Sequence, residues 1–482
     1  MEITLLIDNQ DVAAVGGATF ERVGPLGKGV ASRAAAARAA DAQAAADAAA
    51  RAFPAWAAMG PNARRSLLLA AADIMEQRGD AFASAMMAET GSSAGWAHFN
   101  VHLAASMLRE AASLTTQVRG QTILSDRPGC LAMTVRRPAG VVLGIAPWNA
   151  PVILGVRAVA TPLACGNTVV LKASEQCPAT HRLIGDVFSD AGFPAGVVNV
   201  VTNAPADAGE VVAALVRHKA VRRINFTGST RVGRIIAGLA AEELKPVLLE
   251  LGGKAPMIVL DDADLDAAVG AAGFGAYMNS GQICMSTERI IVHEGIADAF
   301  IEKFRARVEG LRAGDPTKGP APLGSVVDHV TAERIRHFVS DAVGKGAKVL
   351  GGVGDDPTLL SAVALADITP AMQIYAEESF GPVTTILRAR DDEDAIRLAN
   401  DTEYGLTSAV FSRDISRALS VAERIDAGMC HINGPTVHDE AQMPFGGTKA
   451  SGYGRFGGDA GIDEFTELKW LTIDTGTLHL PI

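Results

Sequence analysis

Cysteine and aromatic residues are scarce in this chain, and it has no run of basic residues. Its 482 residues include five cysteines, and aromatic side chains make up 5%. No two cysteines are spaced as CxxC, so neither a zinc site nor a redox dithiol is expected and the thiols are predicted to be reduced. Lysine and arginine number 43 against 54 acidic residues, a net charge of −11. This balance argues against nucleic-acid binding.

Long apolar runs are also missing. The most apolar stretch, residues 139–156, is interrupted by Gly144, Pro147, Pro151 and Gly155, which a membrane helix of about 20 residues would not tolerate well. The first residues have no basic segment, and their apolar stretch is too short for a signal peptide. We therefore expect a cytoplasmic protein without membrane contact.

The composition is otherwise that of a globular protein. Hydrophobic residues make up 48% of the chain and there are 50 glycines, and at about 150 residues per domain the length predicts about three structural units. Residues 31–53 and 62–89 are rich in alanine and are predicted to form long helices, with Pro54 and Pro61 between them.

Short Val/Ile/Leu runs alternate with helix-like segments from residue 140 onward. The first series comprises residues 141–145, 168–171, 197–201 and 223–226. A second series comprises residues 255–260, 288–292, 347–350 and 383–387. Such alternation predicts parallel strands joined by crossover helices. The fold class is therefore α/β, with two Rossmann-like parallel-sheet domains.

Two further strand-like stretches, residues 130–137 and 468–474, lie outside both series. Because isolated two-stranded ribbons are rarely stable in water, we expect them to pair as a small β flap for oligomerisation.

Three residues are candidates for catalysis. Cys284 lies in a small, polar, Gly-containing segment, where a thiolate can form, although a small buried hydrophobe is the more common role of a lone cysteine. Glu250 lies among leucines just before Gly-Gly, and an apolar setting raises the pKa of a carboxylate toward neutrality; a solvent-facing glutamate is the alternative. The amide of Asn149 can stabilise an oxyanion or form an Asx turn.

Other polar residues follow the predicted strands of the first series. Lys172 and Glu175 can bind the hydroxyls of a nucleotide ribose, or they are a surface ion pair. The segment that starts at Phe226 opens a helix, and the N–H groups near Gly228 and Ser229 can hold a pyrophosphate. A helix cap has the same residues, so this signal is weak by itself.

Taken together and in order, these segments resemble the aldehyde dehydrogenase superfamily over nearly the whole chain. The matching motifs are Pro147-Trp-Asn, Lys172 with Glu175, Phe226-Thr-Gly-Ser, Leu249-Glu-Leu-Gly-Gly-Lys, Gly281-Gln-Ile-Cys, Glu378-Ser-Phe-Gly-Pro and Pro444-Phe-Gly-Gly.

The resemblance implies a covalent mechanism. The thiolate of Cys284 would attack the aldehyde carbon, and the amide of Asn149 with the Cys284 N–H would hold the oxyanion. Hydride would pass to the nicotinamide, and Glu250 would activate the water that hydrolyses the thioester. Branches that transfer the acyl group to coenzyme A commonly lack this glutamate, so the resemblance favours hydrolysis.

The same resemblance implies NAD as the cofactor and no metal. A Glu175 carboxylate would repel the 2′-phosphate of NADP. The implied cofactor-binding residues are Ile145, Pro147, Trp148, Lys172, Ser174, Glu175, Phe226, Gly228, Ser229, Gly252, Glu378 and Phe380.

The domain boundaries rest on changes of pattern along the chain. Residues 1–119 and 139–248 are expected to form the NAD-binding domain, with a return segment at about 448–467. Residues 249–447 are expected to form the catalytic domain, and residues 120–138 and 468–482 the oligomerisation strands. Because end strands seek edges on a neighbour, we expect a homodimer or homotetramer.

For the substrate, the segment from His431 to Gly447 resembles bacterial vanillin, salicylaldehyde and benzaldehyde dehydrogenases. Arg157 would lie in an otherwise apolar funnel, where its partner is either a phenolic oxygen of the substrate or a protein carboxylate. The candidate substrate-binding residues are Trp96, Ala150, Ile153, Arg157, His438 and Phe445.

We therefore expect oxidation of hydroxylated benzaldehydes. Two alternatives stay open: an aliphatic semialdehyde or betaine-type aldehyde dehydrogenase, in which Arg157 pairs with a charged substrate, and a non-catalytic scaffold protein.

Overall fold

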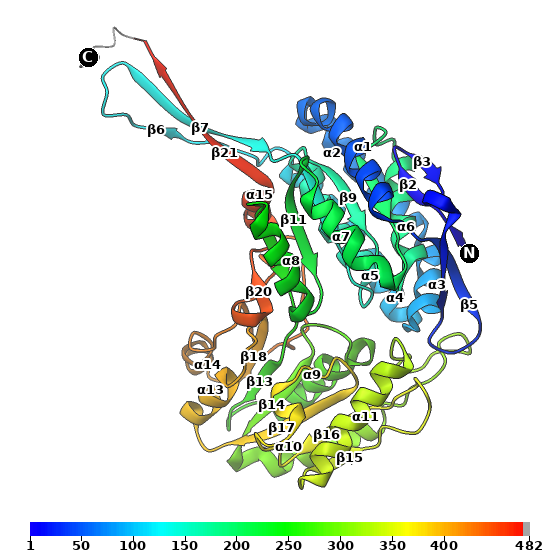
Figure 1. Cartoon of the computed structure of the whole chain (residues 1–482). Coiled ribbons are helices and arrows are strands. Elements are labelled where there is room, and N and C mark those ends of the chain that lie inside the picture. Colours follow the sequence, from blue (N-terminus) through cyan, green and yellow to red (C-terminus); the bar gives the residue numbers. More distant parts are fainter. Residues whose placement is uncertain (476–482) are drawn as a thin grey trace.

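The computed structural model describes residues 1–475 and contains two large sheets, each flanked by helices, with a ribbon that projects from one side (Figure 1). The predicted strand at 468–482 extends past the described residues, because residues 476–482 lie outside them. Two-sheet α/β architecture with a flap agrees with the fold class predicted from the sequence.

The first sheet has eight strands, of which the central five are parallel. Its central strands are rich in Val, Ile and Leu and buried on both faces, as parallel sheets require. The strands in spatial order are β20 (Gly452–Tyr453), β12 (Val247–Glu250), β11 (Val221–Thr227), β8 (Val141–Ile145), β9 (Thr168–Lys172), β10 (Val198–Val201), β2 (Leu5–Ile7) and β3 (Gln10–Val12).

Eight helices accompany this sheet. Proline at the first position starts α2, α5 and α6, where the missing N–H has no helical partner to lose. The helices are α1 (Ala39–Ala58), α2 (Pro61–Gln77), α3 (Gly79–Thr90), α4 (Ala94–Leu114), α5 (Pro151–Ala164), α6 (Pro178–Asp190), α7 (Ala208–Arg217) and α8 (Thr230–Glu242).

The second sheet has seven strands, all parallel except the edge strand β15. In order they are β15 (Lys348–Gly351), β16 (Val363–Ala366), β17 (Val383–Ala389), β14 (Thr287–His293), β13 (Ala255–Val259), β18 (Thr407–Phe411) and β19 (Met429–Ile432). Its helices are α9 (Leu265–Tyr277), α10 (Glu294–Glu309), α11 (His329–Gly344), α12 (Gln373–Ala376), α13 (Asp392–Asn400) and α14 (Ile415–Ala422).

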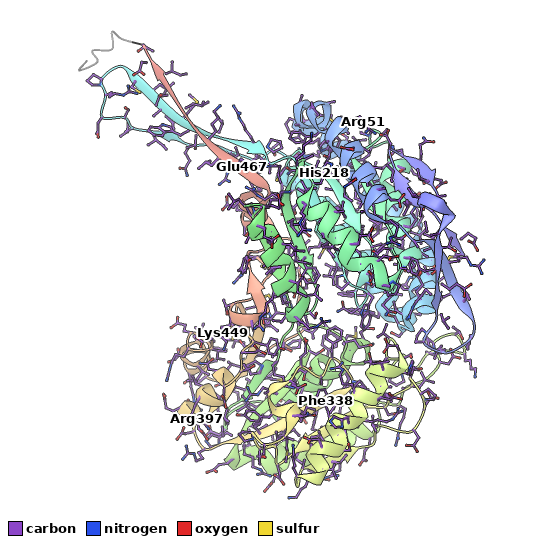
Figure 2. The ribbon with its side chains drawn as sticks, in the orientation of Figure 1. Arg51, His218, Phe338, Arg397, Lys449 and Glu467 are labelled. Carbon is purple, nitrogen blue, oxygen red and sulfur yellow. The ribbon has the colours of Figure 1, made fainter. Side chains whose placement is uncertain are left out.

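The flap joins segments far apart in the chain. β7 (Cys130–Pro138) pairs antiparallel with β21 (Thr466–Asp474), and β6 (Thr122–Ile123) adds a short third strand. Helix α15 (Gly458–Phe465) leads into β21, and Figure 2 shows Glu467 at the base of the flap. There Glu467 forms an ion pair of 3.0 Å with Arg223 of β11, which ties the flap to the first sheet.

The N-terminal region departs from the predicted helix pattern. Residues 31–35 belong to strand β5 (Val30–Ala35), which pairs with β4 (Thr19–Val23) and β1 (Glu2–Ile3). The first helix begins at residue 39, where Asp41 accepts the N–H of Arg38, and Pro54 lies inside this helix rather than after it. Alanine favours helices only weakly, and pairing with two strands outweighs that preference.

None of the helices within residues 1–475 combines the length and the hydropathy that a membrane-spanning segment requires.

Candidate active site

Four strands of the first sheet end side by side. β12 ends at Glu250, β11 at Thr227, β8 at Ile145 and β9 at Lys172. The register pairs Thr227 with Glu250 and Ile145 with Lys172. The carboxyl edge of an open parallel sheet is where ligands bind in α/β proteins, so these residues mark one wall of a site.

Residues that precede the strands of the second sheet form the other wall of the site. Cys284 lies three residues before β14, and Glu378 lies five residues before β17. Gly253 lies between β12 and β13, where a Cβ atom would lie 2.3 Å from the carbonyl oxygen of Cys284. Glycine is therefore required for the two segments to approach so closely.

A cavity of about 320 Å³ extends from this meeting point along the first sheet. Seven of the twelve predicted cofactor-binding residues line it, together with all three predicted catalytic residues. Its lining comprises Pro147, Trp148, Asn149, Leu154, Thr227, Gly228, Ser229, Glu250, Leu251, Gly252, Cys284, Arg334, Glu378 and Phe380. Ile145, Lys172, Ser174, Glu175 and Phe226 lie outside this lining.

A second, mostly apolar cavity of about 210 Å³ shares Asn149, Leu154 and Cys284 with the first. The sulfur of Cys284 therefore lies where the two cavities meet. The other lining residues are Trp96, Phe99, Leu103, Ala150, Ile153, Arg157, Phe274, Met278, Ile283, Met285, Val437, Asp439 and Phe445.

Glu250 and Cys284 are both weak acids in this environment. Burial raises the pKa of Glu250 to about 7, and neither carboxylate oxygen has a hydrogen-bond partner within residues 1–475. Burial, together with the charge of Glu250, raises the pKa of the Cys284 thiol well above its usual range. A carboxylate that ionises near neutrality is suited to accept a proton from a thiol or a water.

The backbone around Asn149 and the cysteine loop is held rigidly. The Asn149 carbonyl accepts hydrogen bonds of 2.9 Å from Trp96 Nε1 and from the amide of Asn279, and the Asn149 amide donates to the Gln282 carbonyl at 2.9 Å. Asn279 and Ser280 adopt positive φ angles of 50° and 55°. Residues in this strained region often occur at functional sites, where surrounding contacts hold them.

At the end of β9, Lys172 and Glu175 form an ion pair. Asn203 also donates to Glu175, at 2.9 Å. Burial alone would raise the pKa of Glu175, but the Lys172 ammonium and the hydrogen bonds to the carboxylate together outweigh burial and keep the pKa below its ordinary value. Glu175 is therefore ionised at neutral pH.

Ser229 is the N-cap of α8, and its hydroxyl accepts from Val232 N at 3.4 Å. The helix-cap and pyrophosphate-binding interpretations of this segment are therefore compatible, because a capped helix start can still present its other N–H groups to an anion.

Glu378 is half-buried in the lining of the larger cavity, where it accepts the N–H of Gly253 at 2.9 Å. Burial raises its pKa to about 8. The following residues are fixed by Glu288, which accepts both the N–H and hydroxyl of Ser379 and the N–H of Phe380. Lys254 balances the buried charge of Glu288 at 2.6 Å.

Arg157 has its partner within the protein. Its guanidinium forms an ion pair with Asp439 and lies 4.2 Å from the ring centroid of Phe445. This is the protein-carboxylate alternative that the sequence left open. His438 lines neither cavity; its side chain is 48% exposed and is bonded to Glu440, because the loop turns Asp439 inward instead.

Sequence reasoning missed several lining residues. In the smaller cavity, Phe99 and Leu103 follow Trp96 at helical spacing on α4, and Phe274 and Met278 are one turn apart at the end of α9. The i, i+3 and i+7 spacing of Trp96, Phe99 and Leu103 indicates that they share one face of a helix. It does not indicate what that face contacts. In the larger cavity, Thr227, Leu251 and Arg334 were also missed.

Within residues 1–475, no cluster of three or more His, Cys, Asp or Glu side chains is arranged to hold a metal ion.

A half-buried cysteine and a buried carboxylate between two α/β units, with a cavity on either side of the sulfur, are the features of a dinucleotide-dependent aldehyde oxidoreductase. The model of the Aldehyde dehydrogenase family matches residues 12–471. The chain belongs to the aldehyde dehydrogenase family, as its sequence motifs predicted.

Individual relatives within this family have more specific names. The chain is 59% identical over 480 residues to a vanillin dehydrogenase of Pseudomonas sp. (strain HR199 / DSM 7063), covering 100% of this chain and 99% of the relative. The crystal structure of a salicylaldehyde dehydrogenase from Pseudomonas putida G7 complexed with salicylaldehyde is 50% identical, with a TM-score of 0.98 and full coverage of both chains.

PnpE from Pseudomonas sp. WBC-3, solved in complex with nicotinamide adenine dinucleotide, is 37% identical with a TM-score of 0.95, covering 100% of this chain and 99% of that chain. The protein is thus an aldehyde dehydrogenase that uses NAD or NADP.

Proposed function

We propose that this enzyme oxidises hydroxylated benzaldehydes, such as vanillin or salicylaldehyde, to their carboxylic acids with NAD and water. The observation that carries the proposal is the smaller cavity, which is apolar, lined by aromatic side chains and open to the sulfur of Cys284. Flat rings pack well against such surfaces. The names of the vanillin and salicylaldehyde relatives support the same substrate class.

Catalysis begins with the thiol of Cys284. Glu250 accepts its proton, and the sulfur attacks the aldehyde carbon. The carbonyl oxygen becomes an alkoxide, for which the Cys284 N–H and the second amide hydrogen of Asn149 are the proposed donors, because the first amide hydrogen is used by Gln282. Rigid placement of Asn149 limits the reorganisation that this step requires.

Collapse of the alkoxide expels hydride from the same carbon and leaves a thioester on Cys284. Glu250, after losing its first proton to solvent, removes a proton from water, and the resulting hydroxide attacks the thioester. The carboxylic acid then leaves and the Cys284 thiolate is restored. One carboxylate with a pKa near 7 thus serves both half-reactions.

The larger cavity fits a nicotinamide dinucleotide. Gly228 and Ser229 lie where α8 starts, so backbone N–H groups are available for a pyrophosphate. At Gly252 a Cβ atom would lie 2.6 Å from Glu378 Oε2, so the absence of a side chain keeps that end of the cavity open. When bound, the nicotinamide supplies the acceptor for the hydride.

We further propose NAD rather than NADP. Glu175 is ionised and held by Lys172 and Asn203. A fixed negative charge at the ribose-binding position repels a 2′-phosphate.

The substrate class is tested with a panel of aldehydes assayed for reduced cofactor formation with NAD and with NADP. Vanillin, salicylaldehyde and benzaldehyde are expected to exceed propanal and succinic semialdehyde in kcat/KM, and NAD to exceed NADP. Higher kcat/KM for the short aliphatic aldehydes would contradict the aromatic assignment, and equal turnover with NADP would contradict the cofactor assignment.

A semialdehyde substrate is less compatible with this cavity. It would require Arg157 to bind a substrate carboxylate, but Asp439 already neutralises that guanidinium.

We also propose a domain division and an oligomer. Residues 1–119 and 139–248, with the return at about 448–467, form the NAD-binding domain, residues 249–447 form the catalytic domain, and the flap joins copies of the chain. Both long flap strands expose apolar side chains: Trp470 on β21 is 71% exposed and Leu131 on β7 is 44% exposed. The outer edge of β21 has no neighbouring strand among residues 1–475, and such edges favour pairing with another chain.

Replacing Trp470 with lysine is therefore expected to weaken a homodimer or homotetramer, because it places a charge in the apolar interface. Light scattering should show a smaller mass for this variant than for the unmodified chain. A matched control is Lys469→Arg, which keeps the charge of the neighbouring position. An unmodified chain that is monomeric would contradict the proposal directly.

A further inference from the structure

A buried ion pair lies beside residues that line the larger cavity. The Lys254 ammonium is 2.6 Å from Oε2 of Glu288, and the two side chains are 0% and 3% exposed. Neither residue lines the larger or the smaller cavity. The pair therefore does not touch cofactor or substrate, and a role in catalysis has to act through other residues.

Glu288 uses its other oxygen, Oε1, to hold a turn of the cavity wall. Oε1 accepts the N–H of Ser379 at 2.9 Å, its hydroxyl at 2.7 Å and the N–H of Phe380 at 3.1 Å. Phe380 has a φ of 46°, a conformation that residues other than glycine rarely adopt and that surrounding contacts must hold. Its ring lines the larger cavity and packs edge-on against Trp148, with 5.7 Å between the ring centroids.

The segments that carry the reacting groups meet at this pair. Lys254 lies four residues after Glu250, and Glu288 lies four residues after Cys284. The Glu288 carboxylate also bonds to the Phe380 turn. The pair thus joins the base, the nucleophile and the cofactor side of the site through short stretches of backbone.

Packing alone does not require charges at these two positions. Buried ions lose their hydration, and apolar side chains of similar volume are often equally stable or more stable. A carboxylate, however, can accept three hydrogen bonds and still bind an ammonium, which an apolar side chain cannot. An acceptor for the strained turn explains the carboxylate of Glu288, and neutralisation of that carboxylate explains Lys254.

We propose that Lys254 and Glu288 are positioning residues for hydride transfer. Glu288 holds the Phe380 turn where it places the nicotinamide ring against the aldehyde carbon, and Lys254 fixes Glu288 relative to the segment that carries Glu250. This inference rests on the proposed function, which assigns the larger cavity to the dinucleotide.

Only part of the reaction depends on this turn. Hydride transfer needs the nicotinamide ring in place, whereas acylation of Cys284 and hydrolysis of its thioester do not. The ester p-nitrophenyl acetate isolates the second part without a cofactor. The Cys284 sulfur bonds to the acetyl carbon, p-nitrophenolate leaves, and water activated by Glu250 releases acetate.

Two double variants test the pair. Lys254→Met with Glu288→Gln removes both charges and keeps a carbonyl acceptor for the turn, whereas Lys254→Met with Glu288→Leu also removes the acceptor. In the acceptor-free variant, kcat for benzaldehyde oxidation with NAD is expected to fall about 10- to 100-fold, as for a reacting group displaced by up to about 1 Å. Its ester hydrolysis should be nearly unchanged, and the variant that keeps the acceptor should lose much less oxidation.

A deuterium isotope effect provides a second readout. If hydride transfer is slowed, it limits turnover, so the ratio of kcat for ordinary benzaldehyde to that for benzaldehyde deuterated at the reacting carbon should rise in the acceptor-free variant. A merely structural role would lower the amount of active enzyme and leave this ratio unchanged.

Ser379→Ala is a milder test that keeps both charges. It removes the hydroxyl that donates to Glu288, so kcat for oxidation should fall about 2- to 10-fold, as for the loss of one hydrogen bond. The isotope effect should rise and ester hydrolysis should not change. Thr384→Val is the matched control, because it removes a buried hydroxyl that donates to the Thr287 carbonyl at 2.7 Å instead of to Glu288.

Three results would overturn the inference. Equal losses of oxidation and ester hydrolysis in the acceptor-free variant would assign the pair to the fold or to the nucleophile and base. Equal kcat for oxidation in the two double variants would exclude the acceptor as the cause. An unchanged isotope effect in Ser379→Ala would also contradict it, and this result is decisive if the double variants do not fold.

Failure of the unmodified enzyme to oxidise any benzaldehyde would contradict the proposed substrate class instead. The same comparison of variants would then be made with propanal, so the two failures are distinguishable.

Discussion

Replacing Cys284 with serine is expected to lower kcat for aldehyde oxidation by at least about 10⁴-fold, as expected when the nucleophile of a catalytic unit is removed. A hydroxyl is a far weaker acid than a thiol, and a carboxylate with a pKa of about 7 is too weak a base to ionise it. The measurement is reduced cofactor formation from vanillin or salicylaldehyde at saturating NAD.

Two controls make this result specific. Cys430→Ser changes an exposed cysteine on β19 that lines neither cavity, and it should leave kcat within about twofold, as for a surface change away from the site. Thermal unfolding of both variants checks that the fold is intact. Turnover by Cys284→Ser close to that of the unmodified enzyme would exclude the covalent mechanism.

Glu250→Gln is expected to reduce steady-state turnover by about 10² to 10⁴-fold, the usual contribution of a general base. Glutamine cannot accept a proton from the water that attacks the thioester, so the acyl group should accumulate on Cys284. Mass spectrometry of the enzyme after mixing with NAD and aldehyde should show a mass increase equal to the acyl group. Turnover by Glu250→Gln equal to that of the unmodified enzyme would exclude Glu250 as the general base.

The pH dependence of kcat is an independent test of the role of Glu250. Because burial raises the pKa of Glu250 to about 7, the group is protonated and inactive as a base at lower pH. The kcat of the unmodified enzyme should therefore rise as pH increases through about 7, and Glu250→Gln should lack this rise.

The contribution of Glu250 to the stability of the fold changes with pH in the opposite direction to kcat. An acid whose pKa is higher in the folded state than in the unfolded state stabilises the fold at low pH, and this contribution is lost as pH rises toward the folded-state pKa. The Glu250→Gln substitution removes the buried ionisable group, so it should not lower Tm above neutral pH. A catalytic defect at unchanged or higher Tm separates chemistry from misfolding.

Some errors of sequence interpretation have a clear physical origin. Residues 31–35 were predicted to be helical because alanine favours helices, yet β4 and β1 provide strand partners that no local pattern reveals. At the smaller cavity, His438 is a predicted substrate contact, but its side chain is 48% exposed and Asp439 lines the cavity instead. Adjacent residues on a loop point in different directions, and only packing decides which one is buried.

The sequence by itself determined the family, four strands of each α/β series, and the candidate catalytic residues Cys284, Glu250 and Asn149. These features are carried by local motifs and by hydrophobic periodicity, which short segments encode. The tertiary structure decided which distant segments meet. It paired β7 with β21, joined two cavities at Cys284, and placed Asp439 against Arg157, 282 residues away along the chain. Such contacts depend on burial and charge balance in three dimensions, which no stretch of sequence specifies alone.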